Sequence, residues 1–326
     1  MSGDVIVTVT LNAALHVDYT TGDLGAEGVN AVSRPSYRAG GRGVTVARVL
    51  RAFGHDVLAA GLAGGASGEL IREDLAKSGV PTAFTLIRGD SRRFFRFAGQ
   101  DQTGPVMRFA EPGPYITTEE LGRFAADYRR LMASAAAVVL CGSLPDGLPV
   151  DTYGSLVTYA AEAGVPVILD VGGEELKHAI GHGPDLVVAE TNSAEPGTEA
   201  LAADLIRLGA GAAAVSAGGL VHAVTPSGGW TARVEATDIT GVTGITGVSG
   251  TDPAYPPARG ALVAGLVPGQ LLGWSWPDRL RHALALAAGG AGAWTRVPGG
   301  PEDRDHVDLA AYERLLDAVR VEPSAR

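Results

Sequence analysis

The fold of this chain is decided by the segment VTVARVLRAFGHDVLAAGL, residues 44–62. Apolar residues over positions 44–53 recur at the spacing of a helix that buries one face. Gly54 ends this helix, and VLAAGL at residues 57–62 follows as a strand. A helix that leads through a glycine turn into a strand is the repeating unit of a mostly parallel sheet covered on both faces.

The same alternation predicts the organisation of the rest of the chain. A first strand is expected at residues 5–10, before the deciding segment. Further strands are expected at 137–140, 165–170, 185–188 and 212–216, and helices at 68–78, 118–133, 150–163, 258–267, 277–293 and 309–319. We therefore expect an α/β fold of three layers with a mostly parallel central sheet, formed by residues 1–326 as a single domain.

A different pattern interrupts the alternation between about residue 80 and residue 112. Short aromatic strands replace helices there, such as FFRF at 94–97 and VMRF at 106–109. Together with residues 19–37 they predict a small separate β-sheet. We expect it to form a lid from two insertions, 19–37 and 94–109.

Composition narrows the class of function. The 326 residues carry 36 acidic against 26 basic side chains, a net charge of −10, which disfavours nucleic acid and anionic membranes as partners. A small-molecule ligand remains the default. The lone cysteine, Cys141, lies in an apolar run and is expected in the core. No signal peptide precedes Val5 and no apolar run is long enough to span a membrane, so we expect a cytoplasmic protein.

Six motifs occur in a fixed order along the chain. They are LNAALH at 11–16, AGGRGVTVAR at 39–48, GGASG at 64–68, EPGP at 111–114, GSLPDGLP at 142–149 and DVGGE at 170–174. In this order and spacing the chain resembles the PfkB carbohydrate kinases, most closely their 1-phosphofructokinase and tagatose-6-phosphate kinase branch. The resemblance implies a ribokinase-like α/β/α fold with a β-sheet lid.

The resemblance also implies where a catalytic base should lie. The family carries Gly-Ala-Gly-Asp directly before a helix, and here ALVAG at 261–265 matches the helix while PARG at 257–260 takes the place of the motif. The expected aspartate becomes Gly260, which cannot accept a proton. Pro257 lacks an N–H donor, and Arg259 adds a side chain where phosphate should approach. The alternative base is Asp252, which ends SGTD at 249–252 in a Gly-rich loop, with residues 253–259 as an insertion.

On the acceptor side, the resemblance assigns sugar binding to five positions. His16 replaces a carboxylate that holds sugar hydroxyls, and Thr45 replaces an asparagine. Gly40 and Gly41 keep the ability to bring backbone close to a sugar. Arg92 matches an arginine that grips phosphate. The alternatives are a lid or loop histidine at position 16 and a solvated charge at position 92.

On the nucleotide side, the resemblance implies a motif Lys-Pro-Asn-x-x-Glu that organises Mg²⁺. Asn192 and Glu195 reproduce its core, but Glu190 and Thr191 replace Lys-Pro. The next family element, a phosphate-facing turn, is shortened here to SAGGL at 216–220. Ser216 and Gly218 are candidates for nucleotide contact, and the alternative is a tight turn without a ligand.

Two function classes follow from the resemblance. The first is a binding or regulatory pseudokinase that holds a sugar phosphate, nucleotide or other ligand without efficient phosphoryl transfer. The second is an active sugar or sugar-phosphate kinase that uses Asp252 as base. We favour the first, because base, sugar carboxylate and nucleotide turn are all altered. ATP and Mg²⁺ are the expected cofactors, with weak or no binding, and a homodimer through the lid is the expected assembly. An enzyme of other chemistry in the same cleft is a third class that no residue supports.

Overall fold

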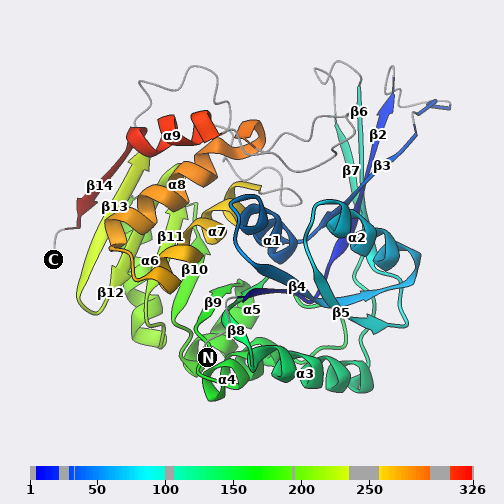
Figure 1. Cartoon of the computed structure of the whole chain (residues 1–326), viewed down its shortest axis with the longest axis horizontal. Helices are drawn as coiled ribbons and strands as arrows, with labels where there is room; N and C mark the ends of the chain where they lie inside the picture. Colours follow the sequence, from blue (N-terminus) through cyan, green and yellow to red (C-terminus); the bar gives the residue numbers. More distant parts are fainter. Residues whose placement is uncertain are drawn as a thin grey trace.

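A computed structural model describes residues 5–21, 29–32, 34–99, 106–192, 195–234, 257–293 and 309–324. Within these ranges the chain forms a large twisted sheet between two groups of helices, with a smaller sheet beside it (Figure 1). The three-layer α/β architecture predicted from the sequence is confirmed.

The large sheet has ten strands in the order β14-β13-β12-β11-β10-β9-β8-β1-β4-β5. Its parallel part runs from β5 to β11, and β11 to β14 pair antiparallel. The strands are β1 (Val5–Thr10), β4 (Val57–Gly64), β5 (Thr82–Ile87), β8 (Ala135–Cys141), β9 (Val167–Asp170), β10 (Leu186–Glu190), β11 (Ala213–Ala217), β12 (Leu220–Thr225), β13 (Gly228–Val234) and β14 (Val319–Pro323). The antiparallel end was not expected, because its strands are not the continuous apolar runs by which buried parallel strands are recognised.

Helices cover both faces of this sheet. One face carries α1 (Arg42–Ala52), α2 (Gly65–Lys77), α7 (Pro257–Leu272), α8 (Trp276–Ala293) and α9 (Leu309–Ala318). The other carries α3 (Thr118–Met132), α4 (Thr152–Glu162), α5 (Gly173–Ala179) with the short 3₁₀ helix η1 (Ile180–His182), and α6 (Glu195–Leu208). No helix in the described ranges is long and apolar enough to cross a membrane.

Strand β8 explains how one sheet holds two cores. Ala137, Val139 and Cys141 contribute to the core under α1, α7 and α8. Val138 and Leu140, which point the opposite way, join the core under α3, α4 and α6. A central strand buried on both faces must be apolar at every position, and β8 is. The prediction that Cys141 lies in the core is confirmed, since its side chain is fully buried.

The small sheet has the strand order β3-β2-β6-β7. Its members are β2 (Ala14–Thr21), β3 (Ser36–Gly40), β6 (Arg92–Gly99) and β7 (Met107–Ala110). In Figure 1 it projects beside α2, away from the antiparallel end of the large sheet. It begins before the expected insertions, so His16 and Arg92 lie on strands at its inner end. Its role as a lid stays a prediction.

Three helical features were not predicted. Helices α5 and α6 were not anticipated, and α7 continues five residues beyond the expected end, through Pro268 to Leu272. Leu266 and Val267, before the proline, are fully buried against α1 and α8. Packing on both sides keeps this segment helical where the local proline signal favours an end.

Candidate functional site

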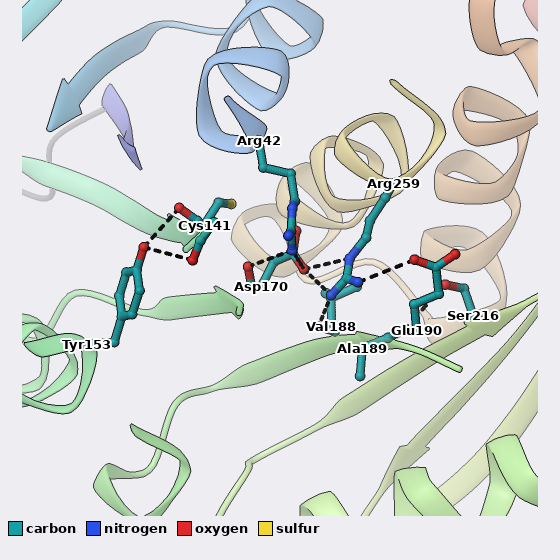
Figure 2. Close-up of polar contacts among 10 residues, drawn as sticks. Arg42, Cys141, Tyr153, Asp170, Val188, Ala189, Glu190, Ser216 and Arg259 are labelled. Atoms are coloured by element: carbon teal, nitrogen blue, oxygen red, sulfur yellow. Dashed lines mark hydrogen bonds and ion pairs between the residues drawn. The ribbon is translucent and has the colours of Figure 1, made fainter. Parts of the chain in front are cut away.

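The candidate site lies where the carboxyl ends of four parallel strands meet the first turn of α7. Cys141 ends β8 beside Asp170 at the end of β9, and Glu190 ends β10 beside Ser216 on β11. Figure 2 shows these residues with Arg259 of α7 and Arg42 of α1 directed toward them. The carboxyl edge of a parallel sheet is where ligands of α/β proteins bind, because helix N-termini and strand ends converge there.

Asp170 is the centre of this arrangement. Its side chain is 0% exposed, and its Oδ1 accepts hydrogen bonds from Arg42 Nη1 at 2.9 Å and Arg259 Nε at 2.8 Å. Burial alone would lower the pKa of Arg42, but the Asp170 charge outweighs it and raises that pKa above its ordinary value. The Arg42 guanidinium therefore stays charged beside the buried Asp170 side chain.

Arg259 connects Asp170 to a second carboxylate. Its Nη2 lies 2.5 Å from Asp170 Oδ1, and its Nη1 lies 3.4 Å from Glu190 Oε2. Nη2 also donates to the backbone carbonyl of Val188 at 3.4 Å. The Arg259 side chain is only 14% exposed. The guanidinium is thus inserted into the protein and directed at its own carboxylates (Figure 2).

Gly260, the position that the resemblance gives to a catalytic aspartate, is buried against α1. A Cβ built on Gly260 would lie 2.7 Å from Thr45 Cγ2 and 2.9 Å from Thr45 Cβ, closer than carbon atoms pack. Thr45 is fixed by its helix, with its backbone N–H donating to the Gly41 carbonyl at 3.0 Å. A carboxylate side chain has no room at position 260 unless α1 or α7 shifts.

A shallow pocket opens beside the ion pairs. Its apolar wall comes from β12, β13, α7 and α8: Leu220, Val221, Val234, Leu262, Leu284, Ala287 and Ala288. The remaining wall is the β11–β12 hairpin with Glu190 and Arg259, the charged residues that line it. An apolar pocket with a few polar groups at one end suits a flat, partly polar small molecule.

The β11–β12 connection is a two-residue hairpin turn. Gly218 and Gly219 both have positive φ, +53° and +87°, and Ala217 pairs with Leu220 across the turn. This is the backbone that glycine favours in tight hairpins. Ser216 uses its hydroxyl to donate to the Ala189 carbonyl at 3.4 Å. Ser216 and Gly218 both line the pocket, so the turn and the candidate ligand wall are the same segment.

At the acceptor end, His16 occupies the space over Gly40. The side chain is 6% exposed, and a Cβ on Gly40 would lie 1.9 Å from His16 Nε2, so only glycine fits beneath this ring. Burial lowers the pKa of His16 to about 4, helped by the charges of Arg38 and Arg92. The imidazole is therefore neutral at pH 7.

Arg92 lies at the same end, at the start of β6. Its Nε donates to the backbone carbonyl of Asn12 at 3.3 Å, and burial lowers its pKa. The Asn12 amide in turn donates to Ser143 Oγ at 3.3 Å. Arg92 and His16 are therefore brought together beside the carboxyl ends of β1 and β8. His16 is buried and Arg92 is half-buried, both on strands of the small sheet, and their roles in sugar binding stay predictions.

The remaining predicted residues are not joined to this centre in the described chain. Asn192 is exposed after β10, and Glu195 begins α6, with its side chain outside the description. Asp252 lies outside the described residues. The pairing of Arg259 with Asp170 and Glu190, and that of Arg42 with Asp170, were not predicted from the sequence. Each of these charged residues lies at the end of an apolar strand or at the start of a helix, and this position could have marked it as a candidate. The sequence alone does not reveal which acidic residue pairs with which arginine.

Comparison with known proteins places this geometry in a family. The family model described as pfkB family carbohydrate kinase matches residues 7–217. Tagatose-6-phosphate kinase of Staphylococcus epidermidis is 35% identical over 176 residues, 54% of this chain and 56% of that protein. The chain thus matches about half the length of this curated relative.

Solved structures match nearly the whole chain. A putative phosphofructokinase from Staphylococcus aureus has a TM-score of 0.78 at 21% identity, covering 98% of this chain and 99% of that one. Phosphofructokinase-2 from Escherichia coli, in complex with potassium, has a TM-score of 0.79 at 22% identity, covering 97% and 99%. These likenesses confirm the ribokinase-like fold. With the family model matching more than half of its residues, the chain belongs to the pfkB family of carbohydrate kinases.

Proposed function

We propose that this chain binds a sugar phosphate or a related small molecule in its cleft and transfers phosphoryl groups poorly. One observation carries the proposal: the Arg259 guanidinium is held by Asp170 and Glu190 at the head of α7. In the resembling kinases a glycine stands at that position, so that phosphate can approach backbone N–H groups. Here Arg259, already paired with two carboxylates, occupies the same position.

The crowding at Gly260 supports the same conclusion. Phosphoryl transfer to a hydroxyl needs a group that takes its proton, worth about 10²–10⁴-fold in rate. Gly260 offers none, and Thr45 leaves no space for one. Phosphoryl transfer by this chain is therefore expected to be slow, and we do not expect a neighbouring residue of α7 to act as the base.

The acceptor end supports an anionic ligand. Arg92 offers a cation there, and His16 offers a neutral ring where the family carries a carboxylate. A guanidinium can form paired hydrogen bonds with phosphate, so this end of the chain favours an anionic ligand. Phosphofructokinase-2 from Escherichia coli has been solved in complex with fructose-6-phosphate, which makes a sugar phosphate the first ligand to test.

Weak ATP and Mg²⁺ binding belongs to this proposal. Among the described residues no group of three or more His, Cys, Asp or Glu side chains could hold a metal ion. The Asp170 and Glu190 carboxylates are already paired with arginine. The donor set in the described chain therefore does not fit a divalent cation.

The second candidate is an active sugar-phosphate kinase with Asp252 as base, Arg92 on the substrate phosphate, and Asn192 with Glu195 near Mg²⁺. Membership of a carbohydrate kinase family and the 35% identity to a tagatose-6-phosphate kinase favour it. It requires residues 253–256 to return Asp252 to the head of α7.

We further propose a cytoplasmic homodimer joined through the small sheet. All four residues of its edge strand β7 are exposed, including Phe109 at 54%. Among the described strands β7 lies at the edge of the small sheet, and an edge strand with exposed Met107 and Phe109 favours pairing with a second copy. Phosphofructokinase-2 from Escherichia coli has been solved in a tetrameric inhibited form.

Turnover measurements decide between the two candidates. Wild type and Asp252→Asn are assayed with ATP, Mg²⁺ and fructose 1-phosphate, fructose 6-phosphate or tagatose 6-phosphate. The binding protein is expected to turn over far below the ~1 s⁻¹ of working kinases, with no change in Asp252→Asn, while a sugar phosphate raises its melting temperature. Turnover above about 1 s⁻¹ that collapses in Asp252→Asn would overturn the proposal.

A further inference from the structure

The charges at the head of α7 balance without any ligand. Asp170 and Glu190 contribute two negative charges, and Arg42 and Arg259 contribute two positive ones. Asp170 is fully buried, and a buried carboxylate requires a cation close by. Among the described residues Arg42 pairs with Asp170, whereas Arg259 contacts both carboxylates and so bridges β9 and β10.

Arg259 lies between Asp170 and Glu190, at a position that would otherwise suit a metal ion. Two carboxylates at the ends of neighbouring strands form a common half-site for Mg²⁺, which prefers hard oxygen ligands. Here Nε and Nη2 of the guanidinium approach Asp170 Oδ1 at 2.8 and 2.5 Å, and Nη1 approaches Glu190 at 3.4 Å. A dication entering beside two guanidiniums would meet repulsion from both.

We propose that the Arg259 guanidinium is the resident cation of this cleft, in place of a divalent metal bridging Asp170 and Glu190. This inference rests on the proposed function, and it means that ligands of the site bind without Mg²⁺. Because the guanidinium is part of the chain, no separate cation has to bind first. Its planar set of N–H donors can form hydrogen bonds with an anionic group of a ligand in the pocket. The Glu190 contact, 3.4 Å long and at a 35% exposed side chain, is the one a ligand anion would replace.

Direct metal binding tests the assignment without any nucleotide or sugar. Mn²⁺ is titrated into wild type and Arg259→Ala, and the free ion is followed by electron paramagnetic resonance. Wild type is expected to show no specific site at millimolar Mn²⁺. Arg259→Ala uncovers two carboxylates with one remaining guanidinium, so its Mn²⁺ affinity is expected to rise by about tenfold or more. Arg259→Ala with Glu190→Gln should lose this gain.

Arg207→Ala is the matched control, because Arg207 makes an exposed pair with Asp204 on α6. It should behave as wild type. If Arg259→Ala does not fold, Arg259→Gln keeps the length of the side chain without its charge and must show the same gain. A wild-type Mn²⁺ site that Glu190→Gln abolishes overturns the inference, as does a folded Arg259 variant that gains no affinity.

The proposed function can fail independently. If wild type transfers phosphate rapidly but free protein binds no Mn²⁺, the binding-protein proposal is wrong while the assignment of Arg259 stands. If a sugar phosphate stabilises wild type only with Mg²⁺ and not with EDTA, the assignment of Arg259 is wrong while a binding function stands.

Discussion

At the scale of single residues, the site is decided by how closely α1 approaches α7. Thr45 and Gly260 touch so tightly that a methyl group on Gly260 would overlap two carbon atoms of Thr45. Arg259, one residue earlier, takes the opposite direction and enters the charged cluster. Within one helical turn, position 260 thus has no room for a carboxylate, and Arg259 supplies a cation.

Gly260→Ala is expected to destabilise the protein by about 1–3 kcal/mol, since an added carbon in a packed contact forces neighbours apart. Gly122→Ala on α3 is the control, because nothing lies within 4 Å of its added Cβ. That substitution should leave stability unchanged or raise it by up to about 1 kcal/mol. Urea unfolding of both variants measures the difference. Equal effects would mean that α1 and α7 are not in tight contact. Gly260→Asp, which meets the same overlap, should not raise turnover.

At the scale of elements, the sequence predicted what depends on local pattern. Helix and strand positions such as α3, α4, β1 and β4 follow from apolar spacing and glycine stops, and their boundaries agree within a few residues. The ion pairs of the site could not be predicted from the sequence. Asp170 and Arg259 are 89 positions apart, and only the strand order brings β9 beneath α7. Sequence motifs predicted a site near residues 257–260, and that stays a prediction, but they did not indicate which charged side chains meet there.

A second buried ion pair shows how elements around the cleft are joined. Asp74 of α2 pairs with Arg48 of α1, and its Oδ2 accepts the Ala39 N–H of β3 at 2.6 Å. The two side chains are 6% and 8% exposed. This carboxylate therefore ties two helices of the central domain to the small sheet.

Asp74→Ala is expected to cost about 3–5 kcal/mol of unfolding free energy, because it leaves Arg48 buried without this partner. Glu69→Ala on the same helix removes an exposed pair with Arg72 and should cost less than about 1 kcal/mol. Chemical denaturation of the two variants compares them. Similar losses would show that the Asp74 pair is accessible to water in solution.

At the scale of the whole molecule, the candidate binding residues come from both sheets. The large sheet and its helices supply Asp170, Glu190 and Arg259, while the small sheet supplies His16 and Arg92. The sugar-binding roles of His16 and Arg92 stay predictions. The fold could be predicted from the sequence. The neutral state of His16 could not, since it depends on burial over Gly40 and on arginines from three different elements.

Two neutral histidines, the buried His16 and the half-buried His282, make the stability of the whole molecule depend on pH. Burial lowers the pKa of His16 to about 4, with Arg38, Arg92 and Arg48 adding to the shift. Burial also lowers the pKa of His282 to about 4, with His55 contributing. In the unfolded chain both take up a proton near the ordinary value of 6.5. The unfolded state therefore binds more protons than the folded state between pH 6.5 and 4, and stability falls as pH falls through that window.

The loss from His16 alone is expected to be about 2 kcal/mol between pH 7 and pH 5, with a smaller loss of the same sign from the partly exposed His282. Urea unfolding at the two pH values measures it, because native carboxylates with lowered pKa lose their contribution mainly below this range. His16→Gln keeps a polar side chain over Gly40 and does not titrate, so its stability should change less between pH 7 and pH 5 than that of wild type. His282→Gln should show a smaller flattening. An unchanged pH dependence in His16→Gln would mean that the imidazole takes up its proton within the folded cleft, where its charge would then face Arg38 and Arg92.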